Sequence, residues 1–113
     1  MHPDFVEMLS ALSAAEAEFL VVGAHALAAH GLVRATGDLD IWIRPTPQNA
    51  QRVWTTLKTF GAPLDQLTEA ELAETDLVFE IGVAPQRIDL LTSISGVEFE
   101  PALRNRTADG SGT

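Results

Sequence analysis

The stretch Gly37-Asp38-Leu39-Asp40-Ile41-Trp42-Ile43 places two aspartates, one residue apart, at the start of an apolar run. Because side chains alternate between the two faces of a strand, Asp38 and Asp40 are expected on the same face, with the intervening apolar residues on the other. Two carboxylates this close repel each other unless a cation or a proton lies between them. Hard oxygen ligands of this kind suit Mg²⁺. The alternative is a pair of solvated acids in a loop or at a helix cap, but the Ile-Trp-Ile run favours a strand that carries a metal site.

A third acid occurs in a second short apolar stretch, Gln86-Arg87-Ile88-Asp89-Leu90-Leu91-Thr92. A carboxylate in such surroundings needs a partner. If this strand lies beside the one that carries Asp38 and Asp40, three carboxylates meet, which is enough to hold two divalent ions for a phosphoryl displacement. Arg87 would share a strand face with Asp89, so a structural salt bridge without any metal is the alternative. Both readings stay open at this point.

Upstream of these acids, the apolar residues 19–22 predict a buried strand that enters a turn at Gly23, and an Ala-rich helix follows up to His30. Gly23 is either a plain strand-to-helix turn, which needs glycine for steric reasons, or an anion-binding position in front of the helix. In the next loop, Arg34 and Thr36 are either solvated or in contact with nucleotide phosphates.

Taken in order, these three elements resemble the nucleotidyltransferase superfamily whose catalytic core is shared with DNA polymerase beta. The likeness rests on Val22-Gly23-Ala24, Asp38-Leu39-Asp40 and Ile88-Asp89-Leu90, and it covers about residues 18–103. It is closer to small bacterial stand-alone members, including those related to toxin–antitoxin nucleotidyltransferases. The resemblance implies an α/β fold, a small mixed β-sheet with helices largely on one side.

The activity that the resemblance implies is the Mg²⁺-dependent transfer of a nucleoside monophosphate from an NTP such as ATP to an acceptor hydroxyl. The acceptor class is open: a tRNA, a protein or a small molecule. The alternative is a non-catalytic module of the same fold that acts as a partner protein, for example in a toxin–antitoxin pair.

The resemblance also implies roles for the residues that lie in the matching motifs. The three aspartates would be catalytic and would hold two Mg²⁺ ions, and the nucleotide would bind at residues in and after the glycine turn: Gly23, Ala24, Arg34 and Thr36. Ala24 departs from the pattern, because the family usually has Gly or Ser there. Alanine keeps the backbone amide that holds phosphate and loses any hydroxyl.

The net charge of the chain limits the classes of partner that it can bind. Seven Lys and Arg against sixteen Asp and Glu give a formal net charge of −9, which argues against general nucleic-acid binding. A triphosphate held through a metal ion and backbone amides is compatible with this charge. A group of acids with no intervening base predicts a solvated face or a dock for a basic partner: Asp65, Glu69, Glu71, Glu74, Asp76 and Glu80.

At 113 residues the chain is expected to form one domain over residues 1–105, with 106–113 as a disordered tail. No signal-peptide pattern opens the sequence, and no apolar run approaches the ~20 residues of a membrane span, so we expect no membrane association and a cytoplasmic location. The remaining patterns predict helices over 3–16, 47–60, 68–73 and 97–103, and an antiparallel hairpin of strands 77–83 and 86–92.

Overall fold

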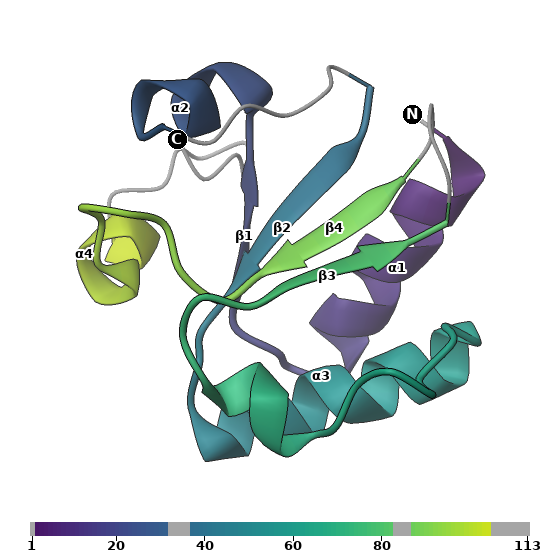
Figure 1. Cartoon of the computed structure of the whole chain (residues 1–113). Coiled ribbons are helices and arrows are strands. Elements are labelled where there is room, and N and C mark those ends of the chain that lie inside the picture. Colours follow the sequence, from purple (N-terminus) through teal and green to yellow (C-terminus); the bar gives the residue numbers. More distant parts are fainter. Residues whose placement is uncertain (1, 32–36, 83–86, 105–113) are drawn as a thin grey trace.

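A four-stranded mixed sheet organises the part of the chain that the computed structural model describes, residues 2–31, 37–82 and 87–104 (Figure 1). The elements follow one another along the chain as α1 (Pro3–Ala14), β1 (Phe19–Val22), α2 (Ala24–Ala29), β2 (Leu39–Ile43), α3 (Pro47–Phe60), a 3₁₀ turn η1 (Ala70–Ala73), β3 (Val78–Ile81), β4 (Ile88–Leu91) and α4 (Phe99–Arg104). The expected α/β class is therefore confirmed.

The strand order in the sheet is β1-β2-β4-β3, so β2 and β4 form its centre. The pair β1–β2 is antiparallel, β2–β4 is parallel, and β3–β4 is the antiparallel hairpin that the sequence predicts. In this register Asp40 lies opposite Asp89 across the central parallel pair. The mixed sheet thus brings together two acids that are far apart in the sequence.

The larger core lies between one face of the sheet and the two long helices, α1 and α3 (Figure 1). It is built from fully buried apolar side chains of the sheet and of both helices, among them Met8, Leu12, Ile41, Val53, Leu57 and Leu90. The boundaries of α3 follow from local chemistry. Its N-cap Thr46 accepts a hydrogen bond from the backbone N–H of Asn49 at 3.3 Å, and Gly61 ends the helix in the left-handed region at φ +89°.

A smaller core covers part of the other face, where the short helices α2 and α4 pack on the sheet. Trp42 of β2 meets Phe99 of α4 edge to face, with 5.0 Å between ring centroids. The helices therefore lie on both faces, the long pair on one and the short pair on the other. The part of this second face that belongs to β3 stays open, because Val78 is 43% exposed.

Most predicted elements are present, with shorter bounds. The capping box is confirmed, since the backbone N–H of Thr68 donates to Glu71 Oε1 at 2.9 Å, although the turn that follows is 3₁₀. The predicted tail, 106–113, lies outside the described residues. Within the part of the chain that the structure describes, no helix has the length and apolar character to cross a bilayer.

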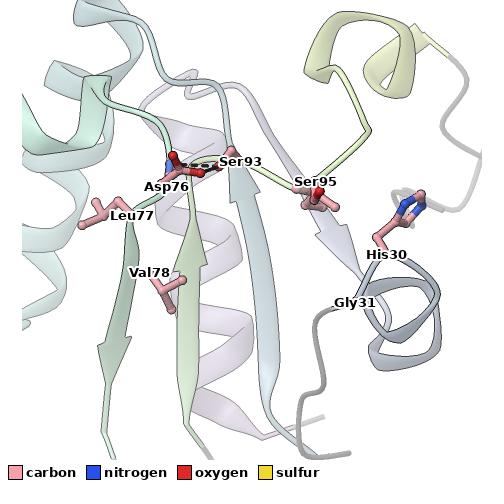
Figure 2. Close-up of a pocket in the computed structure, with 8 residues that line it drawn as sticks. His30, Gly31, Asp76, Leu77, Val78, Ser93 and Ser95 are labelled. Atoms are coloured by element: carbon pink, nitrogen blue, oxygen red, sulfur yellow. Dashed lines mark hydrogen bonds between the residues drawn. The ribbon is translucent and has the colours of Figure 1, made fainter.

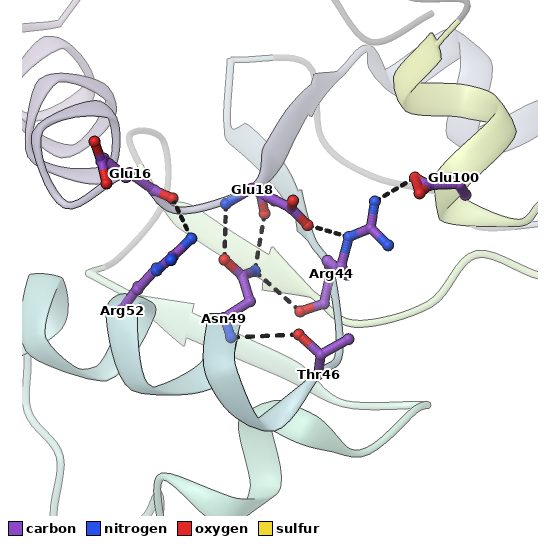
Figure 3. Close-up of polar contacts among 7 residues, drawn as sticks. All are labelled: Glu16, Glu18, Arg44, Thr46, Asn49, Arg52 and Glu100. Carbon is purple, nitrogen blue, oxygen red and sulfur yellow. Dashed lines mark hydrogen bonds and ion pairs between the residues drawn. The ribbon is translucent and has the colours of Figure 1, made fainter.

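A buried amide that the sequence did not single out joins three elements at the opposite end of the sheet from the acids (Figure 3). Asn49, in the first turn of α3, is 2% exposed. Its Oδ1 accepts from the backbone N–H of Glu18 at 2.7 Å, and its Nδ2 donates to the carbonyl oxygens of Glu18 and Arg44, each at 3.0 Å. This one side chain therefore holds the start of β1 and the end of β2 against α3.

Arg44 continues this network toward α4 (Figure 3). Its guanidinium pairs with Glu18 and with Glu100, and it lies over the Phe99 ring at 5.1 Å from the centroid. The hydrogen bond to Glu100 raises the pKa of Arg44, with the charge of Glu18 acting in the same direction and burial acting against it. Arg44 thereby fixes α4 to the end of β2.

Candidate functional site

Three buried aspartates lie on one face of the two central strands. Asp40 and Asp89 are 2% and 0% exposed and are register partners on β2 and β4, which places them on strands about 4.8 Å apart. Asp38 precedes Asp40 by two residues and shares its face, with a side chain that is 1% exposed. We call Asp38, Asp40 and Asp89 the acid row. Its two strands are adjacent, as the sequence argument required.

Glu80 extends the acid row onto β3. It is the register partner of Asp89 in the hairpin, and its side chain is 50% exposed. The sequence argument placed Glu80 in a solvated acidic face, which agrees with its exposure but not with its position beside a buried acid. Counting the pairing outward from the short hairpin link would have found it.

Arg87 lies among these carboxylates and contacts three of them. Its Nε donates to Asp89 Oδ1 at 2.8 Å and its NH2 to Asp89 Oδ2 at 3.2 Å. NH2 also lies 3.3 Å from Asp38 Oδ2, and NH1 lies 3.5 Å from Glu80 Oε2. The hydrogen bonds to Asp89 raise the pKa of Arg87, the surrounding carboxylates add to this, and burial acts against it. The salt bridge that the sequence left open is therefore formed.

The donor chemistry of the acid row suits a hard divalent cation, because it consists of carboxylate oxygens on rigid strands. Asp38 Oδ2 is buried and makes no hydrogen bond within the described part of the chain. Among the described residues, one guanidinium faces three contacting carboxylates, and the side chains of two of them, Asp38 and Asp89, are buried. As the side chains stand, however, no three His, Cys, Asp or Glu residues among those described lie close enough together to hold a metal ion. The space between Asp38 and Asp89 is taken by Arg87.

The glycine turn lies beside the acid row, because Gly23 directly follows Val22, the register partner of Asp40. Gly23 is the N-cap of α2 with φ −77° and ψ 150°, an extended conformation that any residue adopts. A Cβ added to Gly23 would have no heavy atom within 4 Å. The steric explanation for this glycine is therefore wrong. Among the described residues, neither the backbone conformation nor the neighbouring atoms require glycine at this position.

The other residues assigned to nucleotide binding are placed only in part. Ala24 begins α2, so its backbone N–H belongs to the first helical turn, where no intrahelical carbonyl is within reach. Arg34 and Thr36 lie outside the described residues. Their assigned contacts with nucleotide phosphates stay predictions.

An open cavity of about 510 Å³ lies on the same face of the sheet as the acid row (Figure 2). Val78 lines it, and Glu80 projects from the same face of β3 two residues further on. Figure 2 shows His30 and Ser95 on one side of the cavity and Asp76 on the other. Asp76 is held by Ser93, whose Oγ accepts from the Asp76 N–H at 2.9 Å and donates to Asp76 Oδ1 at 3.1 Å. The cavity thus offers polar contacts on the same face of the sheet, although no acid-row residue lines it.

The site consists of buried carboxylates on adjacent strands, a glycine turn with free space beside it and a neighbouring cavity. In comparisons with protein-family models, curated proteins and solved structures, the chain matches none of them.

Proposed function

We propose that this chain is a metal-dependent nucleotidyltransferase with a nucleotidyltransferase-like core, which moves a nucleoside monophosphate from an NTP such as ATP to an acceptor hydroxyl. The observation that carries the proposal is the position of Asp40 beside Asp89 on parallel strands, with Asp38 on the same face. Gly23, which follows the register partner of Asp40, adds a place where a phosphate chain can approach the backbone.

In this proposal Asp38, Asp40 and Asp89 would hold two Mg²⁺ ions. Bound Mg²⁺ would supply electrostatic stabilisation of the attacking and leaving oxygens. Buried carboxylates on strands provide the rigid ligands that such a site needs.

Groups of the chain itself carry the remaining steps, which are proton transfer, phosphate binding and access of the acceptor. Asp89 accepts the proton of the acceptor hydroxyl, whose oxygen forms a bond to the α-phosphorus while the bond to pyrophosphate breaks. The backbone N–H groups of Gly23 and Ala24 hold the terminal phosphates, with Arg34 and Thr36 as further contacts. The cavity lined by Val78 and Asp76 is the side from which the acceptor reaches Asp89.

The direct test is to incubate the purified chain with each labelled NTP, Mg²⁺ and cell extract, and to identify what becomes labelled. We expect label from one NTP in one acceptor class, and none when EDTA is present. Fractionating the extract into RNA, protein and small molecules before the reaction separates the three acceptor classes. Absence of transfer from all four NTPs, with measurable metal-dependent nucleotide binding, contradicts the catalytic proposal.

The second candidate, a non-catalytic partner module, is favoured by one observation. Arg87 already pairs with Asp38 and Asp89 as a structural salt bridge would. This candidate predicts that ATP binding, measured by equilibrium dialysis, does not change with Mg²⁺. A metal-dependent rise in ATP affinity contradicts it.

Replacing Gly23 by alanine tests the glycine turn. We expect a change within about 0.5 kcal/mol in the free energy of unfolding, because alanine adopts the observed conformation, and its gain in the unfolded state is offset by its weaker capping. ATP affinity in the presence of Mg²⁺ should fall by roughly 10- to 100-fold, since a methyl group forced against a ligand costs about 1–3 kcal/mol. Urea denaturation and calorimetric titration measure the two quantities.

The matched control is Ala28→Ser on the exposed side of α2, which adds one atom away from the turn. It should leave both quantities unchanged. If Gly23→Ala binds ATP as the wild type does, the nucleotide does not approach this turn.

A further inference from the structure

Arg87 occupies the oxygens that a divalent cation needs. Both carboxylate oxygens of Asp89 accept from Arg87, at 2.8 and 3.2 Å, and the same NH2 group lies 3.3 Å from Asp38 Oδ2. A metal ion that binds Asp38 and Asp89 would therefore lie against the guanidinium at these oxygens, where two positive charges repel each other. The two cations compete for one place.

This competition cannot be relieved by loss of the arginine proton. A guanidinium stays charged throughout the range in which proteins are folded, and the neighbouring carboxylates stabilise its charged form further. Arg87 must instead move away when a metal ion enters. Its long, flexible side chain allows the charged end to turn while the backbone of the strand stays in place.

Glu80 lies where it can pair with the displaced guanidinium of Arg87. NH1 of Arg87 already lies 3.5 Å from Glu80 Oε2, on the side away from Asp38. Glu80 projects from β3, an edge strand, and is 50% exposed, whereas the side chains of Asp38 and Asp89 are 1% and 0% exposed. A small rotation thus carries the guanidinium from the buried pair toward a carboxylate at the surface, without leaving it unpaired.

We propose that a divalent metal ion displaces the Arg87 guanidinium from Asp38 and Asp89. Glu80 is then the carboxylate that pairs with Arg87 after this exchange. Both are positioning residues rather than catalytic ones. The inference rests on one part of the proposed function, the binding of a divalent cation by the acid row.

The exchange makes two predictions about metal affinity in the absence of nucleotide. Without the guanidinium the competition is lost, so Arg87→Gln should bind Mn²⁺ about tenfold more tightly than the wild type. Without the receiving carboxylate the displaced guanidinium has no partner, so Glu80→Gln should bind Mn²⁺ about fivefold more weakly.

A double-mutant cycle separates the exchange from simple charge attraction. The probe is MnCl₂ alone, and free Mn²⁺ is measured by electron paramagnetic resonance. In the Arg87→Gln background there is no guanidinium with which Glu80 can pair. Adding Glu80→Gln should therefore change the Mn²⁺ affinity no more than Glu74→Gln does. Glu74 is an exposed acid that serves as the control for loss of one negative charge.

Three results overturn the proposal. Equal weakening by Glu80→Gln in both backgrounds means that Glu80 acts only through its charge. Equal Mn²⁺ affinity of Arg87→Gln and wild type means that there is no competition, and retained nucleotide transfer would then leave the proposed function intact. Absence of Mn²⁺ binding in both proteins means that the acid row binds no ion without nucleotide, which overturns the exchange, and Mg²⁺-dependent nucleotide transfer would still support the proposed function. If Arg87→Gln does not fold, Arg87→Met takes its place in the cycle, because methionine keeps a long, flexible side chain and removes the charge.

Discussion

Asp89→Asn is expected to lower the rate of nucleotide transfer by about 100-fold or more. Loss even of a group that merely supports a metal ligand costs roughly 10- to 100-fold, and Asp89 is assigned here as a ligand and as the proton acceptor. Some nucleotide binding should remain, since Asp38 and Asp40 keep their carboxylates. Single-turnover transfer of labelled NMP and calorimetric titration with ATP and Mg²⁺ measure the two effects separately.

The control for this variant is Asp65→Asn, the same chemical change at an exposed position outside the acid row. It should transfer at the wild-type rate. Circular dichroism must show that Asp89→Asn is folded, because an asparagine offers Arg87 only one acceptor oxygen. A folded Asp89→Asn protein with wild-type transfer would exclude Asp89 from the reaction.

The second large effect is on stability. Asn49→Ala is expected to lower the free energy of unfolding by about 3 kcal/mol, because it removes three hydrogen bonds of about 1 kcal/mol each and leaves the Glu18 N–H without its partner, at a cost of about 1–3 kcal/mol. The carbonyl oxygens of Glu18 and Arg44 still accept from the backbone N–H groups of Arg44 and Thr46. Partial access of water to these groups keeps the total below the simple sum. Urea denaturation followed by circular dichroism gives the value.

Gln48→Ala, the preceding and exposed position of α3, should change stability by no more than about 0.5 kcal/mol. Asn49→Asp is a sharper probe. The aspartate can still accept from the Glu18 N–H, but its second oxygen faces two carbonyl oxygens, so it should be at least as destabilising as alanine. Equal stability of the Ala and Asp variants with wild type would show that this amide does not hold the elements together.

The sequence predicts the elements well where local chemistry decides them. Thr46, Pro47 and Gly61 delimit α3, and the short link after β3 allows only an antiparallel hairpin. The alternation around Asp38 and Asp40 likewise predicts their common face. These features depend on residues close together in the chain, so a single sequence contains the information.

Contacts between distant segments were predicted less well. The division of the helices between two faces depends on where α2 and α4 find apolar partners, such as Trp42. Glu80 joins the acids only through the register of β3 with β4, and Asn49 acts on backbone groups that no side-chain pattern reveals. Gly23 illustrates the converse, because a turn glycine suggests a backbone requirement that the observed φ and ψ do not impose.

The position of Arg87 between Asp38 and Asp89 also bears on how the chain matures. In many small metal-binding domains, folding waits for the ion, because the ligands repel one another until it arrives, and chelators unfold them. Here the chain supplies a positive charge of its own, so we expect the protein to reach its native state in a medium free of divalent ions. If the acid row binds an ion as proposed, chelation should remove the ion and leave the fold in place, so the stability of the protein would not depend on the supply of metal.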